Sequence, residues 1–486
     1  MDILVKFNAN YDSMKKHLLL CIPVIYLLFS CKSLQSVSEP STDSIPNQYI
    51  AASDTANIAN KPYRLFFQDT SLVQLIDTAL VRNWDLQAAL QRIKMAEANL
   101  LMARGALRPR VDASVMSAIR RYGLYTMDGA GNSSTFMLPG KIVPTDLPDY
   151  FTGFQSSWEV DLWGKLKNRK QAALARSLAS AEARNLLLTL LISEIASAYY
   201  DLQASDLELK MIDESVVIQQ RAFDIVKAKK EAGILNELAV KQFEAQLANM
   251  LALRQDVFQQ MQLAENRINS LIGRYPQAVQ RDTTFMSNQM MSGIAAGIPG
   301  QLLENRPDIR QAALELRATR ADVAAARAAF NPSLNITASL GYQSFRPDLL
   351  FRTPESLAYT LVGGMVAPLV NRAALKAAFQ NASAVQLEAV YGYGKTVVNA
   401  YHEVYTELQR SKNLEVLYAQ KVKETELLFQ SISIAEDLFR TGRATYLEVL
   451  FAQQQALKAR VEMVEAKQQL LTTGVHLYKA LGGGWR

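Results

Sequence analysis

The sequence repeats the same motifs, in the same order, across its two halves. The segment DLQAA at residues 85–89 is matched by DIRQA at residues 308–312, and Pro109 is matched by Pro332. Subtracting 85 from 308 and 109 from 332 gives the same separation, 223 residues. A fixed separation indicates an internal duplication, and each copy is then expected to fold as a similar unit.

Later landmarks show that the duplicated units are largely helical. Tyr199 pairs with Tyr401 at a separation of 202 residues, and Gly273 pairs with Gly482 at 209 residues. The separation has grown by seven residues, or one heptad, which leaves the apolar seam of a coiled coil in phase. We therefore expect long stretches of packed helices in both halves.

The hydrophobic pattern also predicts two strands in each half. Apolar and polar residues alternate with a period of two at 111–122 and 150–161, and again at 334–343 and 357–367. A polar loop from Asp128 to Asp149 separates the first two strands. The expected fold class is mostly α with a small β part.

Long helical regions follow the strands. They run from Gly164 to Gly233 and from Asn371 to Gly442, and each would be roughly 100 Å long if continuous. The shorter helical regions, such as Ser71 to Leu107, are about half as long, so two of them match one long helix. Each half is expected to run helix, strand, polar loop, strand, long helix, helix.

These patterns predict five segments. They are a lipoprotein signal peptide at 1–30, a flexible tether at 31–64, a first repeat at 65–273, a linker at 274–297 and a second repeat at 298–486.

The strands cannot close a barrel within one chain. In the second strand, Phe154 and Trp158 lie on one face and Gly153, Gln155 and Ser157 on the other. Four strands are too few, because about eight is the smallest closed number, and an open sheet would leave two unpaired edges. Three chains would supply twelve strands around an aqueous lumen. The small and polar residues would face that water, and Phe154 and Trp158 would face lipid.

The N-terminus has the pattern of a secretory signal. Lys15 and Lys16 precede a mostly apolar stretch from Leu18 to Ser30, which is too short to span a bilayer. Its ending, Leu-Phe-Ser-Cys, resembles a bacterial lipoprotein signal, in which Cys31 becomes the lipidated first residue. An ordinary signal cleaved near Ser30 is the alternative. Met14 is an alternative start to Met1.

Few side chains remain for chemistry after the signal is removed. Cys21 would be lost and Cys31 acylated, which leaves no disulfide, Cys-ligated metal or cysteine nucleophile. His402 and His476 are the remaining histidines, and the sequence has no hydrolase, zincin or P-loop motif. Net charge is +6, but Lys and Arg are scattered among acids. We expect no enzyme, no cofactor, no metal site and no nucleic-acid partner.

Two longer motifs carry a family resemblance. SSWEVDLWGKLKNRKQAA at 156–173 resembles the strand-to-helix signature of outer-membrane efflux proteins of the TolC and OprM type. IPGQLLENRPDIRQAA at 298–313 resembles the opening of the second repeat in the lipoprotein (NodT-type) branch, which serves resistance-nodulation-division pumps. The resemblance covers the chain from about Ser71 onward.

The resemblance implies a homotrimer with a twelve-stranded β-barrel in the outer membrane of a Gram-negative bacterium. The barrel would continue into a twelve-helix tunnel through the periplasm. Implied partners are outer-membrane lipid, a periplasmic adaptor (membrane fusion) protein and an inner-membrane pump that supplies the energy. The implied function is the passive exit channel of a tripartite pump for drugs or other small toxic molecules.

The motifs also predict where strands and helices meet. Pro109 and Pro332 remove a backbone donor where helix must give way to strand. Asp161 with Gly164, and Pro368 with Asn371, mark the return from strand to helix. Trp158 and Trp163 suit a membrane–water boundary, with packing between helices and sheet as the alternative.

The helix-to-helix turns are expected to form the far tip of the tunnel and to contact the adaptor. The tip residues are Gly233, Ile234, Leu235, Gly442, Arg443 and Ala444. Aligned on Gly442, the resemblance implies a gate at Leu447, Glu448 and Phe451. Leu447 would form an apolar ring and Glu448 a ring of carboxylates, unless Glu448 only caps its helix. Phe451 and Ala239 replace acids that are usual in the family.

Two other functions remain open at this point. The exit duct of a type I protein-secretion system shares this fold. A lipid-anchored periplasmic coiled-coil scaffold without a pore is the alternative from a different functional class.

Overall fold

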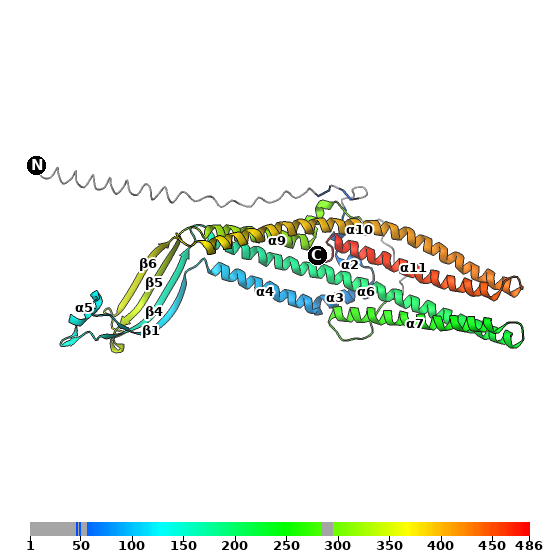
Figure 1. The fold of residues 1–486 in the computed structure, drawn as a ribbon, viewed down its shortest axis with the longest axis horizontal. Coiled ribbons are helices and arrows are strands. Elements are labelled where there is room, and N and C mark those ends of the chain that lie inside the picture. The colour runs from blue at the N-terminus through cyan, green and yellow to red at the C-terminus, as the bar shows by residue number, and fades with distance from the viewer. Residues whose placement is uncertain (1–44, 47, 50–55, 283–294) are drawn as a thin grey trace. The chain divides into compact units, whose positions relative to one another are not determined.

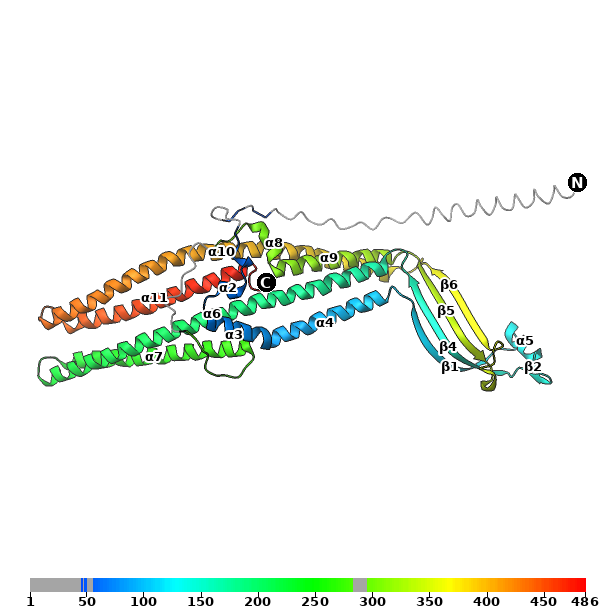
Figure 2. The same cartoon turned by 180° about the vertical axis from the view of Figure 1, so that it is seen from behind.

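The fold is described here from a computed structural model of the chain (Figures 1 and 2). The structure describes residues 45–46, 48–49, 56–282 and 295–486. The predicted signal peptide and Cys31 lie outside these residues. The chain divides into a unit Met1–Pro40 and a unit Ser41–Arg486, and the fold described below is that of the second unit.

The two halves of this unit share a helix, two long strands, a very long helix and a further helix, in that order, and α5, β2 and β3 occur only in the first half. The α-helices are α2 (Tyr63–Phe66), α3 (Thr70–Arg82), α4 (Trp84–Gly105), α5 (Met127–Ser134), α6 (Lys165–Glu231), α7 (Glu237–Ile272), α8 (Leu302–Asn305), α9 (Pro307–Ala328), α10 (Ala373–Arg440) and α11 (Tyr446–Ala480). Short 3-10 turns occupy Ile58–Asn60, Pro299–Gln301 and Pro347–Leu349. The strands are β1 (Arg110–Arg121), β2 (Phe136–Leu138), β3 (Lys141–Ile142), β4 (Asp146–Val160), β5 (Ser333–Ser344) and β6 (Leu357–Val366).

Four strands form one antiparallel sheet in the order β1-β4-β5-β6, so β1 and β6 are its edges. The short strands β2 and β3 form a separate hairpin. Among the helices that the structure describes, none is both long enough and apolar enough to cross a membrane.

Each long helix is covered along its length by pairs of shorter helices. α6 packs on α4 and α9 in the part nearest the sheet and on α7 and α11 in the part beyond, as both views show (Figures 1 and 2). α10 likewise packs on α9 and then on α11. The 67 residues of α6 and the 68 of α10 agree with the lengths expected from the sequence.

The main hydrophobic core lies where the shorter helices meet. Tyr199 and Leu202 of α6 are fully buried there against Ile76 of α3 and Leu477 of α11. The ring of Phe66 stacks on Tyr478 of α11, with 4.0 Å between the ring centroids. The core therefore joins the N-terminal helices to both repeats.

Two equivalent hydrogen bonds close the junctions between short helices. Asn83, just before α4, donates from Nδ2 to the carbonyl of Leu271 at 2.8 Å. Arg306, just before α9, donates from Nη1 to the carbonyl of Ala480 at 2.6 Å. Asn83 and Arg306 are 223 residues apart and Leu271 and Ala480 are 209 apart, the separations found in the sequence. Each bond satisfies a carbonyl in the last turn of a helix, which lacks a partner within the helix.

The structure corrects the expectation of one nearly uninterrupted helical region from Ser71 to Leu107. Asn83 has an extended backbone and separates α3 from α4. Its side chain accepts a hydrogen bond from the Leu86 amide and caps α4. The break follows from a contact 188 residues away, with Leu271, which no local pattern could reveal.

The tether predicted for 31–64 is also corrected for the described residues from 56 onward. Ile58 and Ala59 are buried, and the amide of Ile58 donates to the carbonyl of Ala295 at 3.0 Å. Asn57 forms a β-bridge with Ala296. This stretch is folded because its apolar residues join the central core.

The polar loop predicted from Asp128 to Asp149 contains more structure than expected. It holds most of α5 and the β2–β3 hairpin, and β4 begins at Asp146 rather than at residue 150. The earlier start has a physical cause, because Asp149 is buried and accepts a 2.8 Å hydrogen bond from Gln343 and an ion pair from Arg120 at 3.0 Å.

We predict that Arg306→Met destabilises the fold by about 3–5 kcal/mol, as expected when one member of a buried charged network is removed. The Arg306 side chain is 11% exposed and pairs with Asp308 at 2.7 Å and Glu403 at 2.8 Å. Thermal unfolding of the detergent-solubilised protein, followed by far-UV circular dichroism, measures the effect. Arg440→Met is the matched control, because the Arg440 side chain is 75% exposed. Equal midpoints for the two variants would contradict the assignment.

Candidate functional site: the sheet faces and the helical tips

One face of the sheet is apolar and exposed. Its large side chains come from β1, β4, β5 and β6, and their exposed fractions lie between 54% and 86%. They are Val111, Val115, Ile119, Phe154, Leu340, Tyr359 and Leu361. A continuous apolar surface of this kind is typical of contact with lipid or another protein rather than with water.

The opposite face of the sheet is polar. The strand register aligns Asp112, Gln155, Ser339 and Thr360 in one row across all four strands. These four side chains line a cavity of about 280 Å³ on the sheet. Gln155 therefore lies opposite Phe154, as the alternation predicted.

The predicted junction residues lie where strand and helix meet. Pro109 and Pro332 directly precede β1 and β5. Asp161 accepts hydrogen bonds from the amides of Leu166 at 2.9 Å and Lys167 at 2.7 Å, and so satisfies free donors at the start of α6. Gly164 has a φ of 75°, which favours glycine.

The second repeat returns from strand to helix in a related way. The carbonyl of Pro368, two residues after β6, accepts a 2.6 Å hydrogen bond from Nε of Arg372. Asn371 has a φ of 53° and takes the left-handed conformation that Gly164 takes in the first repeat. Asn tolerates this conformation better than most residues, so the turn is preserved without glycine.

Both tryptophans of the first motif bind backbone carbonyls at the strand–helix junctions. The indole N–H of Trp158 donates to Leu107 at 3.2 Å, and that of Trp163 donates to Pro332 at 2.8 Å. Trp163 is 53% exposed. The two side chains therefore connect a junction of each repeat to the segment where β4 ends and α6 begins, and their position at a membrane boundary stays a prediction.

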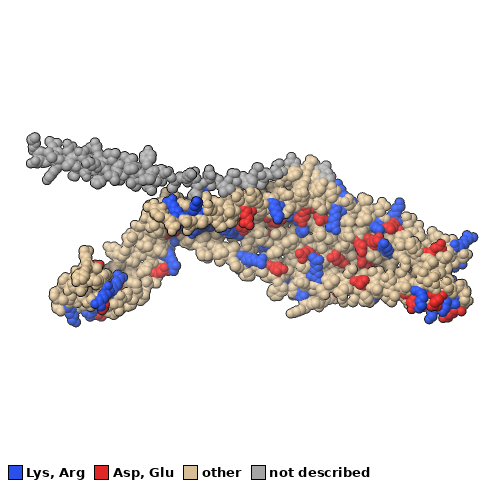
Figure 3. Space-filling view, viewed as in Figure 1, with Lys and Arg blue, Asp and Glu red and all other residues tan. Residues whose placement is uncertain are grey.

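The two predicted tip turns have the same geometry. Gly233 and Gly442 have φ values of 72° and 69°. The amide after each glycine bonds back to the helix, Ile234 to Lys229 at 2.9 Å and Arg443 to Leu438 at 2.8 Å. This is a Schellman ending, for which glycine is the preferred residue. Acidic and basic side chains lie side by side near the tips (Figure 3).

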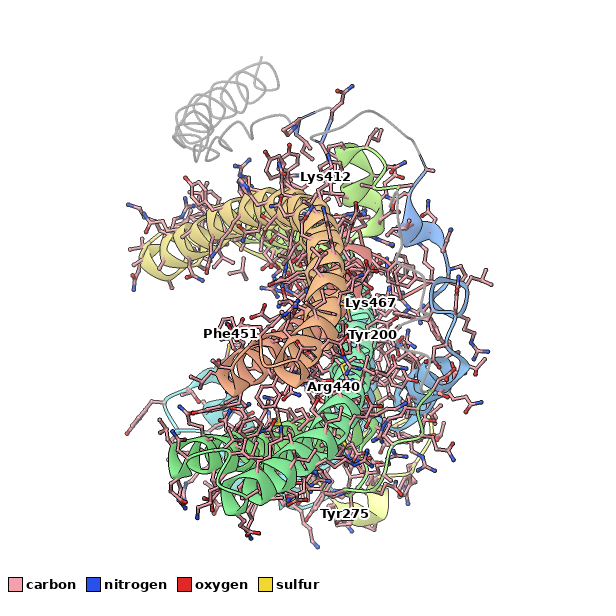
Figure 4. All side chains as sticks on the ribbon, turned by 90° about the vertical axis from the view of Figure 1, so that its right-hand side faces the viewer. Tyr200, Tyr275, Lys412, Arg440, Phe451 and Lys467 are labelled. Atoms are coloured by element: carbon pink, nitrogen blue, oxygen red, sulfur yellow. The ribbon has the colours of Figure 1, made fainter. Side chains whose placement is uncertain are left out.

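The structure places the three predicted gate residues on the first turns of α11. Leu447 is 46% exposed and Phe451 is 63% exposed. Seen end-on, the long helices form a curved layer, with Phe451 on its inner side and α2 and α3 on its outer side (Figure 4). Leu447 lies four residues, about one helical turn, before Phe451, so the two share a helix face. An apolar pair of this kind fits a narrow, poorly hydrated passage.

Glu448 has the capping role that was the alternative to a gate role. Its carboxylate accepts hydrogen bonds from the amide of Thr445 at 2.5 Å and from its hydroxyl at 3.3 Å. Glu448 and Thr445 form a capping box at the start of α11. Ala239, the equivalent residue of α7, is fully buried.

Sequence reasoning missed one residue of this region. Leu238 is the second residue of α7, as Leu447 is the second residue of α11, and the two are 209 residues apart. Leu238 is 59% exposed. The internal repeat carried the signal needed to find it, because 209 is also the separation of the tip glycines.

Comparison with known proteins agrees with this geometry. The profile of the family described as outer membrane efflux protein matches residues 75–274 and 298–483. The cation efflux system protein CusC of Escherichia coli O6:H1 is 28% identical over 443 residues, 90% of this chain and 91% of that protein. The pyoverdine export outer membrane protein OpmQ of Pseudomonas putida is 28% identical over 485 residues, 98% of each.

A solved structure shows the same fold. A crystal structure of CusC, reported with conformational changes accompanying folding and transmembrane channel formation, matches with a TM-score of 0.80 and 25% identity. The match covers 93% of this chain and 100% of that chain. The family profile spans both repeats, and the resemblance indicated by the motifs at 156–173 and 298–313 is confirmed. The chain belongs to the outer membrane efflux protein family.

Proposed function

We propose that three copies of this chain form a channel that conducts small molecules passively from the periplasm to the exterior. The observation that carries the proposal is the sheet, which has two unpaired edges, an exposed apolar face and a polar face. The family places the chain in the outer membrane as a component of an efflux system.

The edges of the sheet support closure of a β-barrel with strands from other copies of the chain. β1 and β6 each have a neighbour on one side only, and unpaired edges favour pairing with another chain. Three copies supply twelve strands, above the roughly eight needed to close a barrel with a filled interior, and enough for an aqueous lumen. The row of Asp112, Gln155, Ser339 and Thr360 would then face water.

The helices support the same number of copies. At the level of the tips, each chain contributes α6, α7, α10 and α11, and at the level nearest the sheet it contributes α4, α6, α9 and α10. Three copies therefore supply twelve helices at both levels. α7 packs on α6 and α10 packs on α11, so α7 and α10 are the flanks that another copy would contact.

The tips would meet the other components of the pump. The turns at Gly233 and Gly442 expose Ile234 and Arg443 at the end of the helices away from the sheet. We assign these turns to a periplasmic adaptor protein, with an inner-membrane pump of the resistance-nodulation-division type supplying the energy. One relative is named as a cation efflux system protein and another as a pyoverdine export outer membrane protein. Because the named cargoes differ, we assign the substrate of this chain only as a small molecule.

Reconstitution tests the channel. We predict that the purified full chain elutes from size exclusion as a trimer and gives discrete single-channel currents in planar bilayers, because the polar faces of its sheets enclose water. A preparation that is trimeric but carries no current would support a periplasmic scaffold instead. A monomer would contradict the closure argument.

Substitutions at the tip test the gate. We predict that Leu447→Ser raises the single-channel conductance by roughly twofold or more, because it removes an apolar ring from the narrowest part. Glu448→Gln is the matched comparison, because glutamine keeps the capping box and removes the charge. If the reversal potential of Glu448→Gln channels shows weaker cation selectivity than that of the wild type, the carboxylate also faces the pore. An unchanged current in Leu447→Ser would remove Leu447 from the gate.

We also propose that Cys31 carries the lipid anchor, on the basis of the Leu-Phe-Ser-Cys ending of the signal. Cys31→Ser is predicted to abolish incorporation of labelled palmitate, because a lipoprotein signal implies acylation at the sulfur of this cysteine and at the α-amino group that cleavage exposes. Wild-type protein from the same cells is the control. Equal labelling of both proteins would favour a different modification site.

A further inference from the structure

A cavity of about 380 Å³ lies where α6, α7 and α11 meet. Its lining includes three carboxylates, one guanidinium, an amide and an exposed leucine: Asp201, Glu208, Glu465, Arg267, Gln468 and Leu263. The volume is in the range of small-molecule sites. None of these residues belongs to the gate, the tips or the strand–helix junctions.

Helix geometry places the cavity on the inner side of the helical layer. Asp206 and Glu265 both pair with Arg281. Glu208 and Leu263 are each two residues from these acids, about 200° around their helices, and therefore lie on the opposite side. The side of α6 that carries Asp206 also carries Tyr199, whose hydroxyl donates to Asp69 before α3, and α3 lies outside the layer (Figure 4).

Glu208 has no partner within the described residues. Its side chain lines the cavity although the residue is only 6% exposed, and no described group donates a hydrogen bond or an ion pair to it. Burial, together with the nearby Glu465 carboxylate, raises the pKa of Glu208 to about 7. A buried carboxylate that faces a second acid lacks the counterion that such groups normally have.

The other charged groups do not supply that counterion. Asp201 is engaged by the amide of Gln468, and its pKa is raised by burial. The positive charge of Arg267 offsets part of this rise in the pKa of Asp201. Arg267 is the single positively charged side chain among the described lining residues. Three carboxylates therefore face one guanidinium, and the cavity is negative when Glu208 is ionised.

We propose that this cavity is a transit site for amphiphilic organic ammonium ions moving through the tunnel. The ammonium group would lie between Glu208 and Glu465, and the apolar part would lie on Leu263, which is 59% exposed. The inference rests on the proposed function, because it requires the inner side of the layer to be the lumen.

Two observations favour an organic cation over a metal ion. No group of three or more His, Cys, Asp or Glu side chains within the described part of the chain is arranged to hold a metal. Leu263 and the neighbouring Ala204 and Ala264 offer an apolar surface beside the acids, which a bare ion would not use. Conduction also requires weak binding, so we expect dissociation constants on the order of 1 mM.

Within the described residues, the second repeat does not reproduce this site. The separation of 202 residues that links Tyr199 to Tyr401 places Arg410 at the position of Glu208 in the second repeat. A cation would be repelled there. Three copies would therefore carry three such sites at one level of the tunnel.

Calorimetry on the full chain in detergent tests the site with benzylammonium chloride as the probe and benzyl alcohol as its neutral analogue. We expect binding of the ammonium alone at pH 8, and about a tenfold loss of affinity in Glu208→Gln, which removes the charge and keeps the shape. Glu304→Gln, an exposed carboxylate on α8, is the matched control and should bind as wild type does.

The pH dependence adds a second measurement. Binding should weaken as the pH falls from 8 to 6, because Glu208 gains a proton while the ligand keeps its charge. The groups that face Glu208 are Asp201 on α6, Arg267 on α7 and Glu465 on α11. Glu208→Gln should lose this pH dependence. If that variant does not fold, Glu465→Gln tests the same site through a loss of affinity at pH 8, because it removes the second carboxylate beside the ammonium group.

Several outcomes would overturn the inference. They are equal affinity in Glu208→Gln and Glu304→Gln, equal binding of benzyl alcohol, or tighter binding of Ca²⁺ than of benzylammonium. Single-channel recording of the wild type separates the two proposals. A channel that conducts but shows none of the expected binding defeats only the transit site, whereas the absence of current defeats the proposed function.

Discussion

The apolar residues of two very long helices, α6 and α10, must be buried by shorter helices, and the rest of the structure depends on this constraint. α6 has 67 residues, whereas α9 has 22 and α7 has 36, so neither neighbour can bury its apolar residues from end to end. Short helices must therefore meet partway along α6 and α10. Their meeting leaves helix ends, with free amides and carbonyls, in the middle of the molecule rather than at its surface.

The central core is the solution to that problem. Asn83 and Arg306 each precede a short helix and bond to the last turn of another, and Trp485 donates to the carbonyl of Asn305 at 2.9 Å. The motif at 298–313 is explained by these contacts, since it contains Asn305 and Arg306. The folded residues from 56 onward and the C-terminal residues pack into the same core, so both repeats are joined at this level of the helices.

The two ends of the helices are adapted to opposite surroundings. The sheet exposes Val115, Phe154 and Tyr359 on one face and aligns polar groups on the other, an arrangement that suits lipid on one side and water on the other. The tips combine glycine turns with exposed Leu238, Leu447 and Phe451. At Glu448 one carboxylate serves helix capping, so the charge of the tip is tied to the stability of α11.

The sequence by itself determined the duplication, the order of helices and strands, the alternating faces of β4 and the turns at Gly233 and Gly442. These features arise from local periodicity and from glycine conformations, both of which are visible within a few residues. Only the tertiary structure decided the break at Asn83, the folding of residues 56–64, the hairpin between β1 and β4 and the cavity at Glu208. Most of these depend on contacts between residues far apart in the sequence, such as the contact between Arg306 and Ala480, which are 174 residues apart. A hydrophobic pattern does not indicate which distant groups will meet.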